Sequence, residues 1–541
     1  MIDDDYLFSD IGIDSIGFYA PRYFLNLEDL AKKRNVDPEK YRKGLMLREM
    51  RLPQVNEDII SIGLKAGYNA LNRGNIDPKE IDAIFVGTET ITYAVKSVSN
   101  IFADLLDISH NCITQDVYNA CAAGTLALLN AIALIEKDVI NKALIITADI
   151  SEYELGSPSE CTQGSGAVGI VLSKNPRVAT FSKKFGKVSG NVNDFFRPAY
   201  EKNAKAFGHY SVDTYLNFQL KAYDDLIKHI GDFHADFYTF HAPFSKLPLK
   251  AMQSIIRKRW MTHINDLPKI RRNNIGYSLL RKLSNFLHDF TALPEYIYLK
   301  LNEKGLSSNT IENIAYQINS NIISKALPQL RVPMHFGNMY SASLWAQIMY
   351  LLENFVQPYD SIYFGSYGSG ATCISGLLKV QKQYQEIIKK GPKIDDFIKN
   401  KIRKTVEEYE EIKMKTFHPQ LYMGKIKAHE NNGQRGFKLH FCDEGCIIPN
   451  IEGLNRCPQG HSGFHEKFFP LFATLKSDLI PSEDFQKCIS QDDVVFIEGN
   501  AEKGKPLEYE IRRINNHLNG TEDIHGLINW APIYVSTKNI Y

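Results

Sequence analysis

The chain has 541 residues, and its 63 basic and 62 acidic side chains leave a net charge of +1. That balance argues against a nucleic-acid or polyanion binder. Apolar residues make up 44% and charged residues 23%, a composition typical of soluble globular proteins, and the length predicts two or more domains. The N-terminal MIDDDYLFSD lacks the apolar core of a secretory signal, and no apolar run is long enough to span a membrane.

Short apolar runs typical of strands alternate with longer helical patterns from residue 12 to about 378, which predicts an α/β fold. The predicted strands are 13–20, 82–89, 143–150, 167–173, 236–242, 361–368 and 372–378. The predicted helices include 57–73, 120–136, 212–230 and 341–355. The pair 143–150 and 167–173 is similar to the pair 361–368 and 372–378, which suggests a duplicated unit.

Three later segments differ from this alternation. Residues about 252–330 begin with a basic, polar run and are mostly helical in pattern, so we interpret them as an inserted helical arm. Residues 394–414 carry both signs of charge and predict one solvated surface helix. Residues about 418–541 contain short β-like runs such as DVVFIEGN and predict a small β-rich appendage.

The stretch DVYNACAAGTLALLNAIALIE, residues 116–136, places Cys121 just before a helix that is apolar nearly all round. Such a helix is buried. The N–H groups at its N-terminus favour an anion, so we expect Cys121 to ionise easily and to act as a nucleophile. A small buried hydrophobe is the alternative, because most free cysteines are just that.

Two further side chains end predicted strands. Burial of the Glu89 carboxylate, in DAIFVGTET, would raise its pKa toward a value useful for moving a proton. His241, in YTFHAPFSKLPLK, can polarise a carbonyl or transfer a proton. The alternatives are a solvated loop carboxylate and a hydrogen-bonded core histidine.

Cationic and glycine-rich motifs follow. Lys246 and Lys250 can hold phosphates, or they are ordinary surface lysines. Asn338 in GNMYSAS and Ser369 in SYGSGA can donate hydrogen bonds to a carbonyl. Neither stretch fits the GxxxxGK[ST] phosphate loop.

As a set and in this order, these motifs resemble the 3-hydroxy-3-methylglutaryl-CoA synthase family of the thiolase superfamily. The matching strings are REMRLPQVNEDIISIG, GTET, ACAAGT, TADISEY, ECTQGSGAV, DFFRP, FHAPFSKLPLKA, GNMYSAS and YGSGA. The resemblance covers about residues 12–378 and is interrupted by a long arm.

The resemblance implies a thiolase-like fold of two similar β/α halves, layered α-β-α-β-α, in a homodimer. It implies that Cys121 accepts an acetyl group from acetyl-CoA, that Glu89 removes a methyl proton, and that His241 binds and polarises the ketone of acetoacetyl-CoA. HMG-CoA and free CoA are then released, and the reaction feeds the mevalonate route to isoprenoids. This chemistry requires no metal or redox cofactor.

The same resemblance assigns further contacts. Lys246 and Lys250 would meet the CoA phosphates or the pantetheine entry. Asn338, Ser369, Thr162, Ser211 and, more weakly, Asp37 would contact the acyl, pantetheine or nucleotide parts of the substrate. Asp149 and Asp194 would be carboxylates that set the geometry around the three main groups.

The domain boundaries that follow are 1–175, 176–380 and 381–541. The last part contains Cys442, Cys446, Cys457 and His461, spaced C-x3-C and C-x3-H. Four such ligands can hold a structural zinc in a zinc-ribbon or OB-like unit, although an unmetallated loop with incidental thiols is the alternative. Some archaeal relatives assemble with an acetoacetyl-CoA thiolase, so such a complex is a further hypothesis.

Eight cysteines are scattered over the chain without a disulfide framework, which predicts a cytoplasmic protein. The resemblance implies small CoA esters as partners, and the charge balance and the absence of a long apolar run predict no nucleic-acid or membrane partner. The second enzymatic hypothesis is β-branching of a carrier-bound ketone in polyketide synthesis, which uses the same three groups. A ketoacyl synthase III-type enzyme would use a Cys–His–Asn set instead. The non-enzymatic hypothesis is a thiolase-fold scaffold, against which Cys121, Glu89 and His241 argue.

Overall fold

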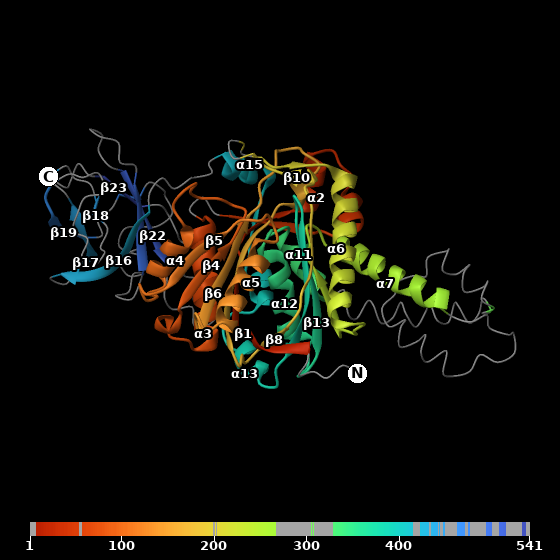
Figure 1. The fold of residues 1–541 in the computed structure, drawn as a ribbon. Coiled ribbons are helices and arrows are strands. Elements are labelled where there is room, and N and C mark those ends of the chain that lie inside the picture. The colour runs from red at the N-terminus through yellow and green to blue at the C-terminus, as the bar shows by residue number, and fades with distance from the viewer. Residues whose placement is uncertain are drawn as a thin grey trace.

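The fold was analysed in a computed structural model (Figure 1). The structure describes residues 7–53, 57–198, 201, 203–266, 305, 307 and 328–414, together with short, mainly β-strand stretches between 422 and 536. One large mixed sheet carries the site, and helices lie on both of its faces.

The N-terminal half of the sheet has the strand order β1-β7-β6-β4-β5. β1 pairs antiparallel with β7, and β7 pairs antiparallel with β6. β6, β4 and β5 run parallel to one another. These strands are Phe8–Tyr19, Ser165–Lys174, Lys142–Ile150, Ala83–Gly87 and Ile113–Val117, in that spatial order.

The C-terminal half repeats this pairing pattern. β8 pairs antiparallel with β14, β14 pairs antiparallel with β13, and β13 runs parallel to β12. β1 also pairs with β8 and so joins the two halves into one sheet. The strands are Ala179–Ser182, Thr372–Val380, Ser361–Gly368 and Phe237–Phe240. The duplicated unit suggested by the sequence is therefore present in the strand pairing.

Four long helices complete the layers. α3 (Ile59–Gly74) packs on β1, β6 and β7, whereas α6 (Gly208–Ile230) packs on β9, β13 and β14. Between them lie α5 (Ala123–Glu136) and α12 (Ala342–Asn354), and α12 contacts strands of both halves (Figure 1). Thr125 on α5 donates a hydrogen bond to Ser366 on β13 and accepts one from Trp345 on α12. With α3 packed on the N-terminal half of the sheet and α6 on the C-terminal half, the two halves form the two β layers of the expected α-β-α-β-α arrangement.

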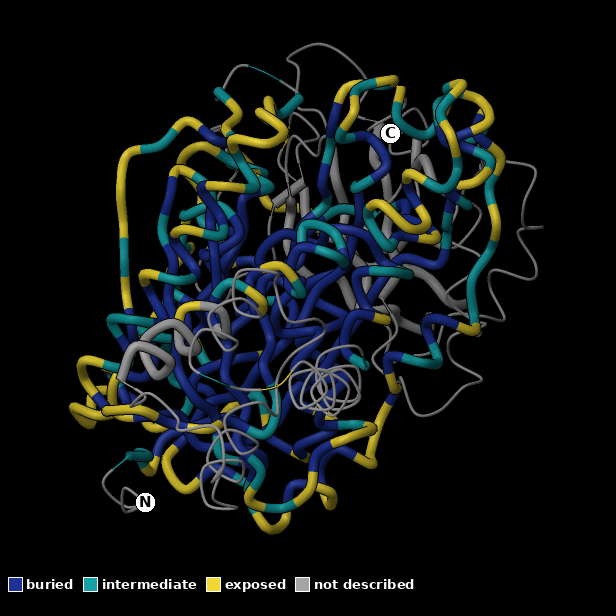
Figure 2. Tube along the Cα trace, turned by 90° about the vertical axis from the view of Figure 1, so that its right-hand side faces the viewer, coloured by how far each residue is buried: buried dark blue, intermediate teal, exposed yellow. Residues whose placement is uncertain are grey.

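Burial explains why these segments fold as predicted. The central strands and helices are buried, while exposed residues are confined mainly to the outer loops (Figure 2). Gly17 on β1 faces α3 so closely that a Cβ there would overlap the backbone at Ala70. The long apolar runs thus form the interior of the sheet and its two central helices.

Shorter elements complete the described chain. They are β2 (Tyr23–Asn26), α2 (Leu27–Lys33), η1 (Lys40–Leu45), β3 (Glu49–Leu52), η2 (Pro78–Glu80), α4 (Val98–Leu105), η3 (Glu160–Thr162), β9 (Gly186–Ser189), β10 (Phe195–Phe196), β11 (Lys205–Ala206), α7 (Lys246–Asp266), η4 (Pro328–Leu330), α11 (Arg331–Phe336), α13 (Tyr384–Ile388), α14 (Ile394–Lys399), β15 (Ile402–Lys404) and α15 (Val406–Met414). The C-terminal strands are β16 (Tyr422–Asn431), β17 (Gln434–Phe441), β18 (Ile447–Ile448), β19 (His465–Pro470), β20 (Thr474–Leu475), β21 (Val494–Gly499), β22 (Glu508–Ile514) and β23 (Ile533–Ser536).

Every strand and helix predicted between residues 13 and 378 is confirmed. The single helix predicted over 394–414 is wrong: the segment divides into α14, β15 and α15, because β15 pairs with β2 and Phe397 is buried. The β-rich C-terminal part is confirmed.

Of the predicted 252–330 arm, α7 is helical as far as Asp266, and most of the remainder lies outside the described residues. No helix of the described chain is both long and apolar enough to span a membrane.

Candidate active site

The thiol of Cys121 and the carboxylate of Glu89 meet inside the molecule. Glu89 follows β4 by two residues, and Cys121 directly precedes the first turn of α5. β4 and α5 approach closely, since a Cβ on Gly87 would overlap the backbone of Gly124. The distance from Cys121 Sγ to Glu89 Oε1 is 3.5 Å, and each residue is only 8% exposed.

Their surroundings disfavour the charged form of both groups. Burial, and then the charge of Asp149, raise the pKa of Glu89 well above its ordinary value. Burial and the neighbouring Glu89 raise the pKa of Cys121 in the same way. The expectation that Cys121 ionises easily is therefore wrong in the free protein, because burial and then the charges of Glu89 and Asp149 disfavour the thiolate.

Asp149, at the end of β6, fixes the loop that carries Glu89. Its fully buried carboxylate accepts hydrogen bonds from Thr88 Oγ1 at 2.8 Å, Glu89 N at 2.9 Å and Thr90 N at 3.0 Å. It also accepts from the backbone N–H of Ser341 at 3.0 Å and from the Ser341 hydroxyl. The Asp149 carboxylate thus joins the Glu89 loop to the start of α12. These hydrogen bonds are consistent with the predicted role of Asp149 in positioning the residues of the site.

His241, immediately after β12, is 1% exposed. Its backbone N–H donates to Gly365 O at 2.8 Å, and its carbonyl accepts from the Tyr215 hydroxyl at 2.6 Å. Burial lowers its pKa to about 3, so the imidazole is neutral at physiological pH. Its Nδ1 atom has no hydrogen-bond partner among the described residues. A buried ring nitrogen without a partner is suited to a polar atom of a bound substrate.

The end of β13 connects His241 to Cys121. Gly365 on this strand accepts the backbone hydrogen bond of His241, and Gly368 lies three residues further along the strand. A Cβ on Gly368 would approach Asn119 O at 2.6 Å and Ala122 N at 2.7 Å, the residues on either side of Cys121. Glycine is therefore required where β13 passes the nucleophile loop.

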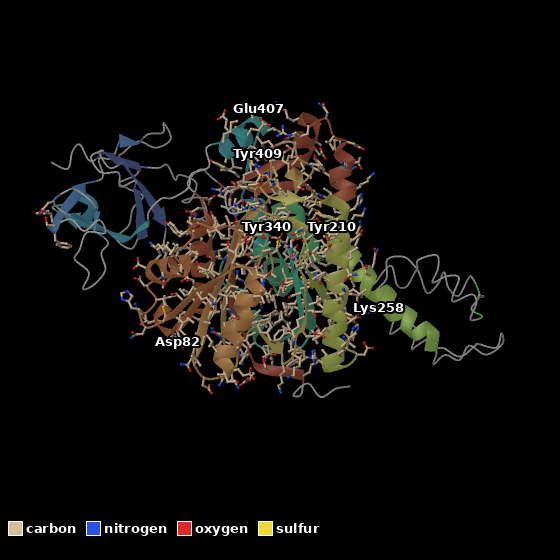
Figure 3. All side chains as sticks on the ribbon, turned by 45° about the horizontal axis from the view of Figure 1, so that its top comes forward. Asp82, Tyr210, Lys258, Tyr340, Glu407 and Tyr409 are labelled. Carbon is tan, nitrogen blue, oxygen red and sulfur yellow. The ribbon has the colours of Figure 1, made fainter. Side chains whose placement is uncertain are left out.

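A cavity of about 460 Å³ opens beside this group. The residues that line it include Glu89, Arg197, Tyr340, Ser369 and Tyr409. Figure 3 shows Tyr340 within the body of the molecule and Tyr409 above it on α15. The cavity gives a small acyl group access to the Glu89 carboxylate.

The predicted CoA-binding cations lie elsewhere. Lys246 begins α7, and its Nζ donates to Lys43 O on η1 at 3.3 Å. Asp37 is exposed, and its carbonyl accepts from Lys40 N at the start of η1. Lys246 and Asp37 thus lie beside the same turn, whereas Lys250 is exposed one turn further along α7. None of the three lines the cavity next to Glu89.

The remaining predicted contacts are internal. The backbone N–H of Asn338 donates to Thr162 O at 2.9 Å, and its Oδ1 accepts from Tyr340 N at 3.0 Å. The hydroxyl of Ser211 donates to Asp194 O at 2.5 Å. Asn338 and Thr162 therefore hold the segment that carries Tyr340. Asp194 is fully buried near the thiol, and its charge contributes to raising the pKa of Cys121.

A metal site finds no support in the part of the chain that the structure describes, where no group of three or more potential side-chain ligands comes together. Cys442, Cys446, Cys457 and His461 lie outside the described residues. The zinc site therefore stays a prediction, to be tested by metal analysis of the purified protein.

Sequence reasoning missed four residues around the nucleophile. Tyr153 and Tyr340 pack against Cys121, and Phe195 lies against both rings, with centroids at 6.1 and 6.0 Å. Arg197 donates a hydrogen bond to Glu89 O at 3.1 Å. All four lie in the strings TADISEY, GNMYSAS and DFFRP, so the motifs held the signal, but the individual side chains were not singled out.

Comparison with known proteins identifies the same family as the sequence motifs. The chain matches the family models for the N-terminal part of hydroxymethylglutaryl-coenzyme A synthase over residues 8–176 and for its C-terminal part over residues 184–435. It is 29% identical over 418 residues to hydroxymethylglutaryl-CoA synthase A of Dictyostelium discoideum, covering 74% of this chain and 81% of the relative. It is 30% identical over 281 residues to the hydroxymethylglutaryl-CoA synthase of Methanocaldococcus jannaschii, covering 51% and 81%.

The fold is also that of a solved structure, MvaS in complex with 3-hydroxy-3-methylglutaryl coenzyme A. The TM-score is 0.62 at 24% identity, covering 79% of this chain and 98% of that one. The family models span most of the chain, and the Cys121–Glu89 pair lies where its motifs predict. The chain therefore belongs to the hydroxymethylglutaryl-CoA synthase family.

Proposed function

We propose that this protein condenses acetyl-CoA with acetoacetyl-CoA to give 3-hydroxy-3-methylglutaryl-CoA (HMG-CoA) and CoA, through an acetyl-Cys121 intermediate. The observation that carries the proposal is the 3.5 Å contact between Cys121 Sγ and Glu89 Oε1, together with the cavity that Glu89 lines. Membership of the family supplies the reaction class. The residue roles below are our assignment from the geometry.

Acetylation of Cys121 comes first. The Cys121 sulfur attacks the thioester carbon of acetyl-CoA, its proton passes to the departing CoA sulfur, and an acetyl thioester remains on the enzyme. The rings of Tyr153 and Tyr340 enclose the sulfur and limit the access of water. A water-poor pocket protects such a thioester from early hydrolysis.

Condensation follows. The acetyl methyl group then lies next to Glu89, whose carboxylate removes a proton; its raised pKa makes it a stronger base. The resulting enolate attacks the ketone carbon of acetoacetyl-CoA. The neutral His241 ring, with a buried and unpartnered Nδ1, donates a hydrogen bond to the oxygen on which negative charge develops.

The direct test mixes the purified protein with both CoA esters. We expect free thiol to appear and HMG-CoA to be detected by mass spectrometry. Release of thiol without HMG-CoA would contradict the proposal. A parallel reaction with acetoacetyl groups on a carrier protein separates the β-branching alternative, which predicts turnover only on the carrier-bound acceptor.

Substitution of Lys246 by alanine tests the CoA entry. We expect it to raise the apparent KM for both CoA esters about 10-fold while leaving kcat nearly unchanged, because a phosphate contact away from the reacting atoms contributes to binding. Lys258→Ala, on the solvent-exposed side of the same helix, is the matched control. An unchanged KM in Lys246→Ala would exclude the phosphate contact.

We further propose that the protein is a homodimer. Among the described strands β5 is the last of the large sheet, and Ile113 in it and Tyr118 directly after it are exposed. Exposed Ile91 and Val95 precede α4 next to this edge. An unpaired apolar edge favours pairing with a second chain. Light scattering should give twice the chain mass of 61.5 kDa, and a monomer mass would contradict the proposal.

The cellular setting is also part of the proposal. We assign the reaction to the mevalonate route in the cytoplasm, where thiols such as Cys121 stay reduced. Acetoacetyl-CoA must come from a thiolase-type condensation of two acetyl-CoA molecules. A complex with such a thiolase would deliver it directly.

A further inference from the structure

The last step of the proposed reaction creates a charge in an unfavourable place. Water attacks the thioester carbon on Cys121, a C–O bond forms, and the C–S bond breaks. One water proton goes to the sulfur, and the second leaves as the new carboxyl group ionises. The new carboxylate of the product forms beside Glu89 and near Asp149 and Asp194. The charges of all three residues raise the pKa of Cys121, so this part of the site disfavours a further negative charge. The neutral His241 cannot balance it.

Arg197 is the cation that lies beside Glu89, where the new carboxylate forms. Its Nη2 donates to Glu89 O at 3.1 Å, and its charge lowers the pKa of Glu89 against the larger effect of burial. Its side chain lines the cavity together with Glu89 and Ser369. A guanidinium has five N–H donors. Among the described residues it makes this single hydrogen bond and no ion pair, so donors remain that can face the cavity.

The position of Arg197 is fixed from both sides. It follows β10, and the preceding Asp194 is fully buried. Asp194 accepts hydrogen bonds from the Tyr367 hydroxyl at 2.6 Å and from Gly370 N at 3.1 Å. Phe195 packs between the rings described above. The guanidinium therefore projects from a backbone that is anchored to β13 and to the walls of the nucleophile pocket.

The other two cations on the cavity wall are already engaged. Arg51 is fully buried and donates to four backbone carbonyl groups, those of Pro21, Arg22, His335 and Phe397. Lys413 donates to Gln163 Oε1 at 2.7 Å. Arg197 is thus the cavity cation that is both next to Glu89 and available to a ligand.

We propose that Arg197 binds the carboxylate that hydrolysis releases from Cys121, and that it thereby distinguishes HMG-CoA from the uncharged acyl groups of the two substrates. The inference rests on the proposed function and adds a residue for its product. Guanidinium–carboxylate pairs form two parallel, charge-assisted hydrogen bonds. Acetyl-CoA and acetoacetyl-CoA carry no such carboxylate, so the contact is specific for the product.

Arg197→Met tests this by titration calorimetry with HMG-CoA, acetoacetyl-CoA and CoA. We expect the Kd for HMG-CoA to rise about 10- to 100-fold, the range for lost charge-assisted hydrogen bonds, while the other two values stay within about 2-fold. Arg197→Lys should recover part of the affinity. Lys205→Met, on the same hairpin but ion-paired with Glu201, is the matched control and should change none of the three.

Three outcomes overturn the assignment: no change for HMG-CoA, an equal loss for all three ligands, or loss of Cys121 acetylation in Arg197→Met. The last two would show that Arg197 only holds the Glu89 loop in place. Failure of the proposed function looks different, because the unmodified protein would then neither form HMG-CoA nor bind it.

Discussion

Cys121→Ala is expected to abolish acetyl-enzyme formation and to reduce turnover by about 10⁴-fold or more, because none of the described residues that line the cavity is another cysteine that could form the thioester. The loss should appear in kcat, with binding of acetoacetyl-CoA little changed. The side chain is small, and Ala122 and Ala123 beside it are already buried, so the fold should tolerate the change. The measurement is acetyl transfer from labelled acetyl-CoA to the protein.

Cys112→Ala is the matched control for this variant. Cys112 is a free, partly buried cysteine that precedes β5 and does not line the cavity. It should be acetylated and turn over like the unmodified protein. Labelled acetyl on the Cys121→Ala protein would show that the nucleophile is another residue.

Glu89→Gln is expected to accept the acetyl group but to lose condensation by about 10²- to 10⁴-fold. The amide oxygen keeps a hydrogen-bond acceptor 3.5 Å from the thiol, so the local packing is retained. The variant also removes one of the charges that, after burial, raise the pKa of Cys121, and so it makes the thiolate easier to form. The measurement is burst acetylation compared with HMG-CoA formation on the pre-acetylated enzyme.

The pH profile separates these roles further. A base must be ionised to act, so condensation should rise with pH through the raised pKa of Glu89 and level off above it. This acidic limb should be absent from the small residual rate of Glu89→Gln. A variant that fails to be acetylated at all would contradict the assignment of Glu89 to proton removal from the methyl group.

Much of the fold follows from local pattern. The apolar runs of β4, β6 and β13 are buried on both faces, so their composition marks them as central strands. The helix after Cys121 buries one face against β4 and β6, whereas its apolar Leu129 and Leu134 are only half-buried. Strand ends also predicted where Glu89 and Cys121 meet, since side chains that carry chemistry follow such ends in α/β folds. The convergence of His241 with these two groups stays a prediction.

Long-range contacts limit what the sequence predicts. The charged run 394–414 has the pattern of one helix, but Arg403 and its neighbours pair with β2, more than 370 positions away. The pKa of Cys121 depends on Asp149 and Asp194, which come from other strands and loops. The proposed role of Arg197 depends on its contact with Glu89, which is far away in the sequence. The local sequence around Arg197 does not predict this contact.

Staged mass spectrometry of the intact protein tests the central claim most directly. After mixing with acetyl-CoA alone, the account predicts one acetyl group, located on the peptide that contains Cys121. Addition of acetoacetyl-CoA should remove this group as HMG-CoA appears. An acetyl group on a different residue, or an acetyl-Cys121 that persists after acetoacetyl-CoA is added, would contradict the account.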